Sequence, residues 1–127
     1  MDALNLCQFD WGATWQLYAP EVAPEIVQAV TGWPVTRDEL LDVGARRVNL
    51  MKIFNSREGF TREDDKLPKR LHEALKGGAS DGVVFSADLL ESAKDTYYAM
   101  AGWDVATSHP TTRRLAELGI AWAVEGV

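Results

Sequence analysis

The chain has 127 residues, of which 46% are hydrophobic and 25% charged, and it carries a net charge of −6 at pH 7. This length and balance suit one ordinary globular domain, and the negative charge argues against nucleic-acid binding, because phosphate contacts need clustered lysines and arginines. No apolar run approaches the roughly 20 residues of a membrane span and no signal peptide is visible, so we expect no membrane partner and a cytoplasmic location.

Helix signals dominate the first half of the chain. The segment from Ala23 to Val30 predicts a short helix that ends near Gly32. Thr36 and Glu39 then form a capping box, in which each side chain accepts a hydrogen bond from the backbone N–H of the other residue. Apolar residues recur at helical spacing behind it, so we expect a helix over residues 37–57.

The block from Phe54 to Arg70 follows this helix and mixes charges of both signs with two phenylalanines, a glycine and a proline. This composition favours an ordered polar connection, in which arginines and acids of the block satisfy one another, over a flexible linker. Alternatively, Arg57, Glu58 and Arg62 reach a cofactor pocket. Both interpretations remain open from the residues alone.

Two further helices are predicted in the second half. Ser86 is a good N-cap and Gly102 a good C-terminal stop, and the residues between them carry one apolar stripe. The stripe consists of Leu89, Leu90, Ala93, Tyr97 and Met100. Thr111 caps a shorter helix over residues 112–118, and residues 120–124 suggest one more helical turn.

Only Val83–Phe85 suggests extended backbone, as a short segment packed on the helices. The sequence therefore predicts an all-α fold of about four to six helices in irregular, orthogonal packing, with residues 1–127 as a single helical domain. Five tryptophans are many for this length, so they predict anchors of a core or a docking surface.

No catalytic residue can be assigned from the sequence. Neither a nucleophile elbow nor a phosphate-binding glycine loop is present. His72 and His109 lack clustered partners along the sequence, so we interpret both as solvated side chains.

The single cysteine, Cys7, lies five residues after Asp2 in an apolar run. One cysteine cannot hold a metal by itself, and most lone cysteines behave as small buried hydrophobes. From the residues alone, Cys7 is therefore a core residue and Asp2 a solvated terminal residue.

Three sets of motifs resemble the C-terminal domain of the tungsten-containing aldehyde ferredoxin oxidoreductases. The first is Arg57-Glu-Gly-Phe-Thr-Arg62 with Asp64-Asp65 and Leu67-Pro68-Lys-Arg70. The second is, in order, Tyr97-Tyr98, Gly102-Trp103-Asp104, Pro110-Thr111, Leu115 and Leu118-Gly119-Ile120, with His109 where a glycine is more usual. The third is Asp2, Leu6 and Cys7, which resemble the family pattern Asp-x-x-Gly-Leu-Cys with Asn5 in place of glycine.

The resemblance implies an enzyme that oxidises an aldehyde to a carboxylic acid and passes electrons from tungsten through a 4Fe–4S cluster to ferredoxin. It implies that Asp2 and Leu6 lie at the pterin of the tungsten cofactor and that Cys7 is the fourth cluster ligand. The other three cysteines, in a Cys-x-x-Cys-x-x-x-Cys motif, are absent here. They are expected from the N-terminal part of the same enzyme or from a separate subunit, so we expect the isolated chain to be inactive and to bind no cofactor.

A second hypothesis is a small helical interaction module that keeps the fold and has lost the redox role. Asn5 and the very short segment before it favour this alternative. Under either hypothesis, an exposed apolar surface in the tryptophan-rich N-terminal third makes self-association possible.

Overall fold

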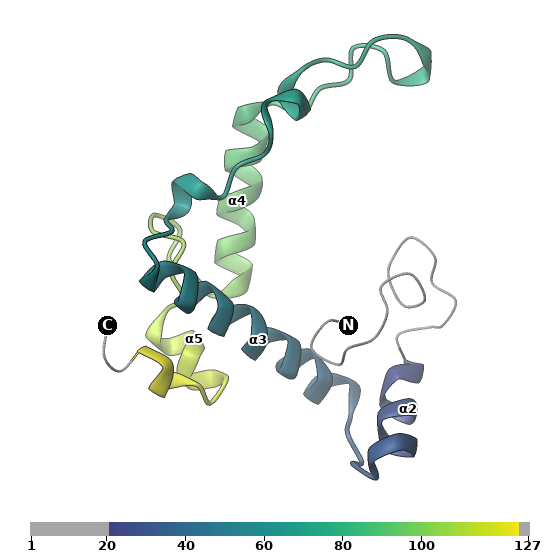
Figure 1. Ribbon diagram of the computed structural model, residues 1–127, viewed down its shortest axis with the longest axis vertical. Helices are drawn as coiled ribbons and strands as arrows, with labels where there is room; N and C mark the ends of the chain where they lie inside the picture. Colours follow the sequence, from purple (N-terminus) through teal and green to yellow (C-terminus); the bar gives the residue numbers. More distant parts are fainter. Residues whose placement is uncertain (1–20, 125–127) are drawn as a thin grey trace. The chain divides into compact units, whose positions relative to one another are not determined.

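The computed structural model describes residues 21–124, and these residues form helices without any β-strand (Figure 1). The α-helices are α2 (Val22–Thr31), α3 (Arg37–Arg57), α4 (Ala87–Ala101) and α5 (Thr112–Glu117). The 3₁₀ turns are η2 (Arg62–Asp64), η3 (Lys69–His72), η4 (Gly78–Ser80) and η5 (Ala121–Val124). The prediction of an all-α fold is confirmed. None of the helices in this range is long and apolar enough to cross a membrane.

The chain falls into two compact units, with the boundary between Met51 and Lys52 inside α3. In the first unit, α2 ends where expected, because Gly32 adopts a left-handed conformation with φ of 74° and its N–H donates to the Gln28 carbonyl. A glycine takes this conformation without steric cost. The prediction of a single domain over residues 1–127 stays a prediction.

The start of α3 is fixed by the predicted capping box. The Thr36 N–H donates to Glu39 Oε2 at 2.7 Å, and the Glu39 N–H donates to Thr36 Oγ1 at 3.2 Å. These hydrogen bonds hold the pKa of Glu39 below its ordinary value, since they favour the ionised carboxylate. The capping prediction is therefore confirmed in both directions.

The helices of the second unit begin at the predicted residues; α4 ends before Gly102 as predicted, and α5 ends at Glu117, one residue before the predicted end. Ser86 Oγ accepts from the Leu89 N–H at 3.1 Å, and Gly102 closes α4 with φ of 75°. Thr111 Oγ1 accepts from the Arg114 N–H at 3.2 Å and so starts α5. The expected last helical turn is present as η5.

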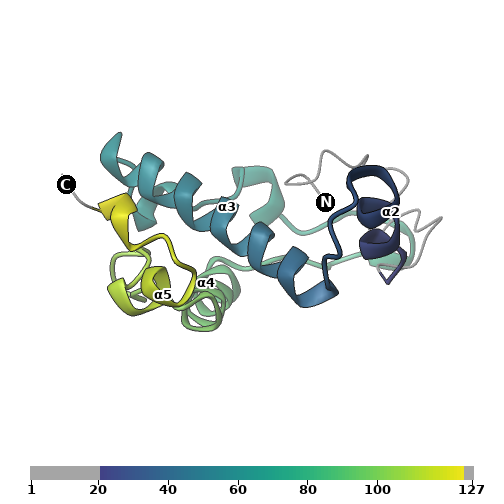
Figure 2. The same cartoon turned by 90° about the horizontal axis from the view of Figure 1, so that it is seen from below.

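The core of the second unit is built largely from residues of the second set of motifs, which runs from Tyr97 to Ile120. Its buried apolar residues are Ile53, Tyr98, Trp103, Leu115, Leu118, Ile120 and Ala123. Both views place η5 beside the C-terminal end of α3, where Arg57 Nη2 donates to the Ala123 carbonyl at 2.6 Å (Figure 2). The motif residues of this half therefore act mainly by packing.

Between η3 and α4 the chain forms an arm that leads away from the N-terminal end of α4 (Figure 1). The arm closes on itself, because the Leu75 N–H donates to the Val83 carbonyl and the Gly82 N–H donates to the Leu75 carbonyl, both at 2.9 Å. Val83, Val84 and Phe85 are all exposed. The prediction that this triplet packs on the helices is wrong in the described part of the chain, since the arm carries it away from them.

Candidate functional site

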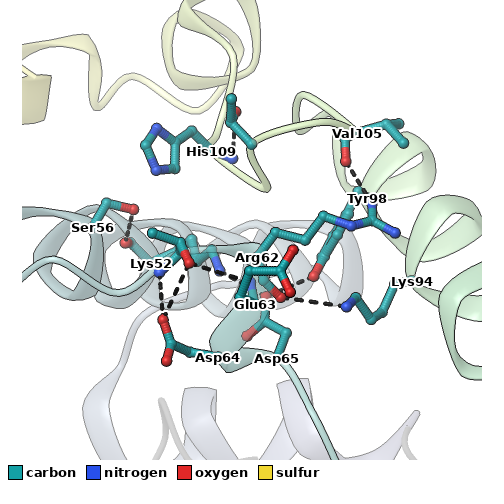
Figure 3. A network of polar contacts seen from close by, with 12 residues as sticks. Lys52, Ser56, Arg62, Glu63, Asp64, Asp65, Lys94, Tyr98, Val105 and His109 are labelled. Carbon is teal, nitrogen blue, oxygen red and sulfur yellow. Dashed lines mark hydrogen bonds and ion pairs between the residues drawn. The ribbon is translucent and has the colours of Figure 1, made fainter. Parts of the chain in front are cut away.

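The residues for which the resemblance implies a cofactor role, Asp2, Leu6 and Cys7, lie outside the described residues. Within residues 21–124, no group of three or more histidine, cysteine, aspartate or glutamate side chains is arranged to hold a metal ion. No residue set in this range therefore fits a cluster or a metal. What the described residues do contain is a polar network in the second unit (Figure 3).

The network centres on the carboxylate of Asp65, which follows η2. Lys52 Nζ from the end of α3 lies 2.9 Å from Asp65 Oδ2, and the Tyr98 hydroxyl from α4 donates to the same oxygen at 2.6 Å. Lys52 and Tyr98 are both buried, whereas the Asp65 side chain is 41% exposed. One carboxylate oxygen thus connects three elements of the second unit.

The contact between Asp65 and Tyr98 shifts the pKa values of both groups away from neutral pH. Burial raises the pKa of Asp65, but the hydrogen bonds from Lys52 and Tyr98 and the charge of Lys52 outweigh it, so the pKa lies below its ordinary value. Burial, together with the hydrogen bond to Asp65, raises the pKa of Tyr98 well above its ordinary value. Asp65 is therefore an anion and Tyr98 a neutral donor, which is the pairing of a structural contact.

Arg62 is the second centre of the network, and its partners lie on α4. Its Nη2 lies 2.8 Å from Glu91 Oε2 and 2.7 Å from Asp95 Oδ1. Its Nη1 donates to the Val105 carbonyl at 2.5 Å, and the guanidinium lies 5.3 Å from the centre of the Tyr98 ring. The hydrogen bonds to Glu91 and Asp95 raise the pKa of Arg62.

Lys94 completes the connection between η2 and α4. Its Nζ lies 2.8 Å from Glu91 Oε1 and 3.3 Å from the Arg62 carbonyl. The interpretation that the arginines and acids of the Phe54–Arg70 block satisfy one another is thus wrong for Arg62, whose acidic partners belong to α4. Through Arg62, the block binds to α4, about thirty residues further along the chain.

An open aromatic hollow lies next to the network. It has a volume of about 370 Å³ and is lined by Lys52, Asp65, Leu90, Ala93, Lys94, Tyr97, Tyr98 and Trp103. Tyr98 stacks on Trp103 with ring centres 5.8 Å apart, Tyr97 meets Trp103 edge to face at 5.6 Å, and Lys52 Nζ lies 5.5 Å from the centre of the Trp103 ring. Both lysines of the lining are already paired with carboxylates, so the hollow is suited to an apolar occupant.

Neither histidine ring is bonded to Asp65 or Arg62, although Figure 3 draws His109 near the network. His72 Nδ1 lies 2.7 Å from the Phe85 carbonyl, at the base of the arm. His109 is exposed and lines a smaller pocket of about 160 Å³ with Ile53, Ser56 and Arg57. His109 lies near the carboxylate of Asp104, whose pKa is lowered mainly by the hydrogen bonds from Thr107. His72 is held by a backbone contact instead of being fully solvated as predicted.

The predictions from the sequence include neither Lys52 nor a polar role for Tyr98. The available signal was Lys52 itself, a lone cation between Met51 and Ile53 on the apolar side of a predicted helix. A lysine at such a position is almost always paired when it is buried, and the partner carboxylate lies 13 residues away.

The described residues define an all-α fold, and its second unit is held together by the ion pairs of Asp65 with Lys52 and of Arg62 with Glu91 and Asp95. The family model described as "Aldehyde ferredoxin oxidoreductase, domains 2 & 3" matches residues 1–120. The chain therefore belongs to the aldehyde ferredoxin oxidoreductase family.

Individual relatives agree with this assignment. The chain is 32% identical over 123 residues to the tungsten-containing aldehyde ferredoxin oxidoreductase of Pyrococcus furiosus, covering 95% of this chain and 19% of the relative. It is also 32% identical over 122 residues to the enzyme of the same name from Pyrococcus horikoshii, covering 94% and 19%. The chain thus spans about a fifth of the length of the curated relatives it matches.

A solved structure shares the fold. It is a chain of the active site complex BamBC of benzoyl coenzyme A reductase in complex with 1,5-dienoyl-CoA, with a TM-score of 0.66 and 24% identity. The match covers 84% of this chain and 14% of that one.

Proposed function

We propose that this chain supplies the C-terminal helical domain of a tungsten-pterin aldehyde:ferredoxin oxidoreductase, which converts an aldehyde to a carboxylate. The observation that carries the proposal is the family match over residues 1–120, which includes the segment with Asp2, Leu6 and Cys7. The names of the relatives supply tungsten, aldehyde and ferredoxin.

In this proposal, Cys7 supplies one thiolate to a 4Fe–4S cluster, and Asp2 and Leu6 border the pterin. A cluster of this type needs four thiolates, and the chain has one cysteine. We use the term companion part for the family polypeptide segment that carries Cys-x-x-Cys-x-x-x-Cys, whether it is joined to this chain or separate. The cluster, when bound, carries electrons between the tungsten centre and ferredoxin.

The described residues support this role as a scaffold. Arg62 and Asp65 of the motif block contact Asp95, Tyr98 and Lys94 of α4 at distances of 2.6–3.3 Å. The lowered pKa of Asp65 and the raised pKa of Tyr98 keep the pair as an anion and a neutral donor, which suits a structural contact. The catalytic and cofactor groups of the proposed enzyme are accordingly assigned to the companion part and to residues 2–7.

Cluster assembly tests the proposal. The chain is incubated with iron and sulfide without oxygen, alone and with the companion part from the same organism, and the absorption and paramagnetic resonance spectra are recorded. We expect a cluster with a full complement of iron only when both are present, and we expect Cys7→Ser to abolish it. The matched control is Ser92→Ala on the exposed surface of α4, which should leave the cluster intact. A spectrum that is unchanged by Cys7→Ser contradicts the role of Cys7.

The second candidate is a helical interaction module without a redox role. The substitution of asparagine at position 5 for the family glycine favours it, because a side chain there limits how closely backbone and cofactor approach. The two candidates differ in one result: the module binds the companion part without assembling a cluster that depends on Cys7.

A further inference from the structure

The helix α4 is amphipathic, and in the described chain its polar side is the side that packs. Glu91, Lys94, Asp95 and Tyr98 follow the i, i+3, i+4, i+7 spacing of one helix face. All four contact Arg62 or Asp65 of the preceding block. This arrangement is unusual for a surface helix, which normally turns its apolar face inward.

The opposite face of α4 is apolar and exposed. It carries Leu89, Ala93 and Met100, with Tyr97 at its edge. Met100 is 82% exposed, Leu89 50% and Tyr97 51%. These residues belong to the stripe that the sequence predicts as the apolar side of the helix, and within residues 21–124 Leu89, Tyr97 and Met100 remain at least half exposed. An exposed apolar stripe that is continuous over three turns marks a surface for another polypeptide.

The aromatic hollow adjoins this face. Ala93 and Tyr97 belong to both, and Leu90 and Trp103 form the inner wall of the hollow. A concave apolar site of about 370 Å³ beside an exposed helix face is the arrangement that receives an anchoring side chain of a partner. Its floor is rigid, because Lys52 and Tyr98 are both bonded to Asp65.

Three kinds of polypeptide could cover the apolar face of α4 and the adjoining hollow: the companion part, a second copy of this chain, and another segment of this chain. Relatives in which this stretch is only 19% of the length provide a large amount of further protein for it to pack against. The solved chain with the same fold has the matched stretch as 14% of its length. A second copy is disfavoured because each copy carries a net charge of −6.

We propose that the apolar face of α4 and the adjoining aromatic hollow form the docking surface for the companion part, with one apolar side chain of the companion part seated in the hollow. This inference rests on the proposed function for the identity of the partner. We call Leu89, Leu90, Ala93, Tyr97, Met100 and Trp103 the α4 docking surface.

Photo-crosslinking identifies the occupant directly. The amino acid p-benzoylphenylalanine is placed at Met100 of the full chain, which is co-produced with the companion part and irradiated. The matched control carries the same amino acid at Ala116, an exposed position on α5. We expect a crosslink from position 100, and none from position 116, to a peptide of the companion part. A crosslink from position 100 to a second copy, a crosslink to residues 1–20 of the same chain, or no crosslink would overturn the proposal.

Binding affinity provides the second measurement. Met100→Glu adds one charge to the α4 docking surface at a position exposed enough not to disturb folding, and Ala116→Glu adds the same charge elsewhere. We expect Met100→Glu to weaken binding of the companion part by roughly tenfold or more and Ala116→Glu by less than about twofold. Equal effects of the two substitutions would overturn the proposal.

The outcomes separate this inference from the proposed function. A cluster that depends on Cys7 but forms without a crosslink at position 100 leaves the proposed function in place and refutes the α4 docking surface. A crosslink to the companion part without such a cluster supports the docking surface and refutes the role of Cys7.

Discussion

The hydroxyl of Tyr98 allows the sharpest test of the network, because Tyr98→Phe removes one oxygen and leaves the stacked ring in place. Tyr98 is 2% exposed, and its hydroxyl donates to Asp65 at 2.6 Å. A hydrogen bond to a charged group contributes about 1.5–3 kcal/mol. Water can partly replace it at a carboxylate that is 41% exposed, so we expect a loss of about 1–2 kcal/mol in the free energy of unfolding.

The expected loss corresponds to a fall of about 4–8 °C in the melting temperature for a domain of this size. The measurement is urea and thermal unfolding at pH 7, followed by circular dichroism. Tyr97→Phe is the matched control, since it removes the same atom from a neighbouring ring that is 51% exposed, and it should cost less than about 0.5 kcal/mol.

A double-mutant cycle with Asp65→Asn assigns the effect to the contact. If the hydroxyl acts through Asp65, Tyr98→Phe costs clearly less in the Asp65→Asn background, with a coupling energy of about 1 kcal/mol. A loss below about 0.5 kcal/mol in the wild-type background, or a coupling energy near zero, would refute the assignment of Asp65 as the centre of the network.

The remaining predictions concern charge, pH and a helix end. Because the folded-state pKa of Asp65 is lowered, its stabilising contribution is present above its unfolded value of about 4 and disappears as the pH falls through the folded value. The difference in the free energy of unfolding between the wild type and Tyr98→Phe should therefore narrow in acid, and a difference that stays constant from pH 7 down to the pH at which the domain unfolds in acid would argue against this linkage. Because the folded-state pKa of Tyr98 is raised, its contribution to the free energy of unfolding is present below about pH 10 and is lost progressively above it. Urea unfolding should therefore show that the wild type loses more stability than Tyr98→Phe between pH 9 and pH 11. Arg62→Lys keeps the charge but loses the forked contact to Glu91 and Asp95, so the melting temperature should fall and become less sensitive to salt; an unchanged melting temperature would show that the fork does not matter. Gly102→Ala should cost about 2–4 kcal/mol, because φ is +75° and the added Cβ would lie 2.9 Å from Arg114 Cδ. Gly119→Ala, with φ of +69° and nothing within 4 Å, should cost only about 1–2 kcal/mol, and equal losses in urea unfolding would contradict the close approach of Gly102 to the Arg114 side chain.

The helix ends were predictable because their signals are local. Thr36 and Glu39 lie three residues apart, Ser86 caps a backbone N–H three residues away, and Gly102 needs only its own conformation. Such contacts are set by neighbouring residues and hardly depend on the rest of the fold. The all-α architecture follows from these signals together with helical periodicity.

The contacts of the polar network, and which face of α4 packs on the rest of the second unit, were not predictable from local signals. The Lys52–Asp65 contact spans 13 residues and the Tyr98–Asp65 contact spans 33, and no local pattern specifies such pairs. Periodicity located the apolar stripe of α4, but it does not indicate whether this chain or another polypeptide covers the stripe. The charged block was thus recognised as an ordered connection, while its partners on α4 became visible only in three dimensions.

The cofactor residues depend entirely on the family relationship. One cysteine has no partner set within its own sequence, so composition and spacing alone favour a core role for Cys7. Only the match over residues 1–120 gives the segment around Cys7 a redox context. The assignment of Asp2, Leu6 and Cys7 therefore remains a prediction.

The most direct test of the central claim is the iron content and paramagnetic resonance spectrum of the chain reconstituted with the companion part, compared between wild type and Cys7→Ser. The proposed function predicts a 4Fe–4S spectrum for the wild-type pair and none for either polypeptide alone or for the Cys7→Ser pair. A full cluster in the companion part alone, or one that persists in Cys7→Ser, would contradict the claim that this domain supplies a cluster ligand.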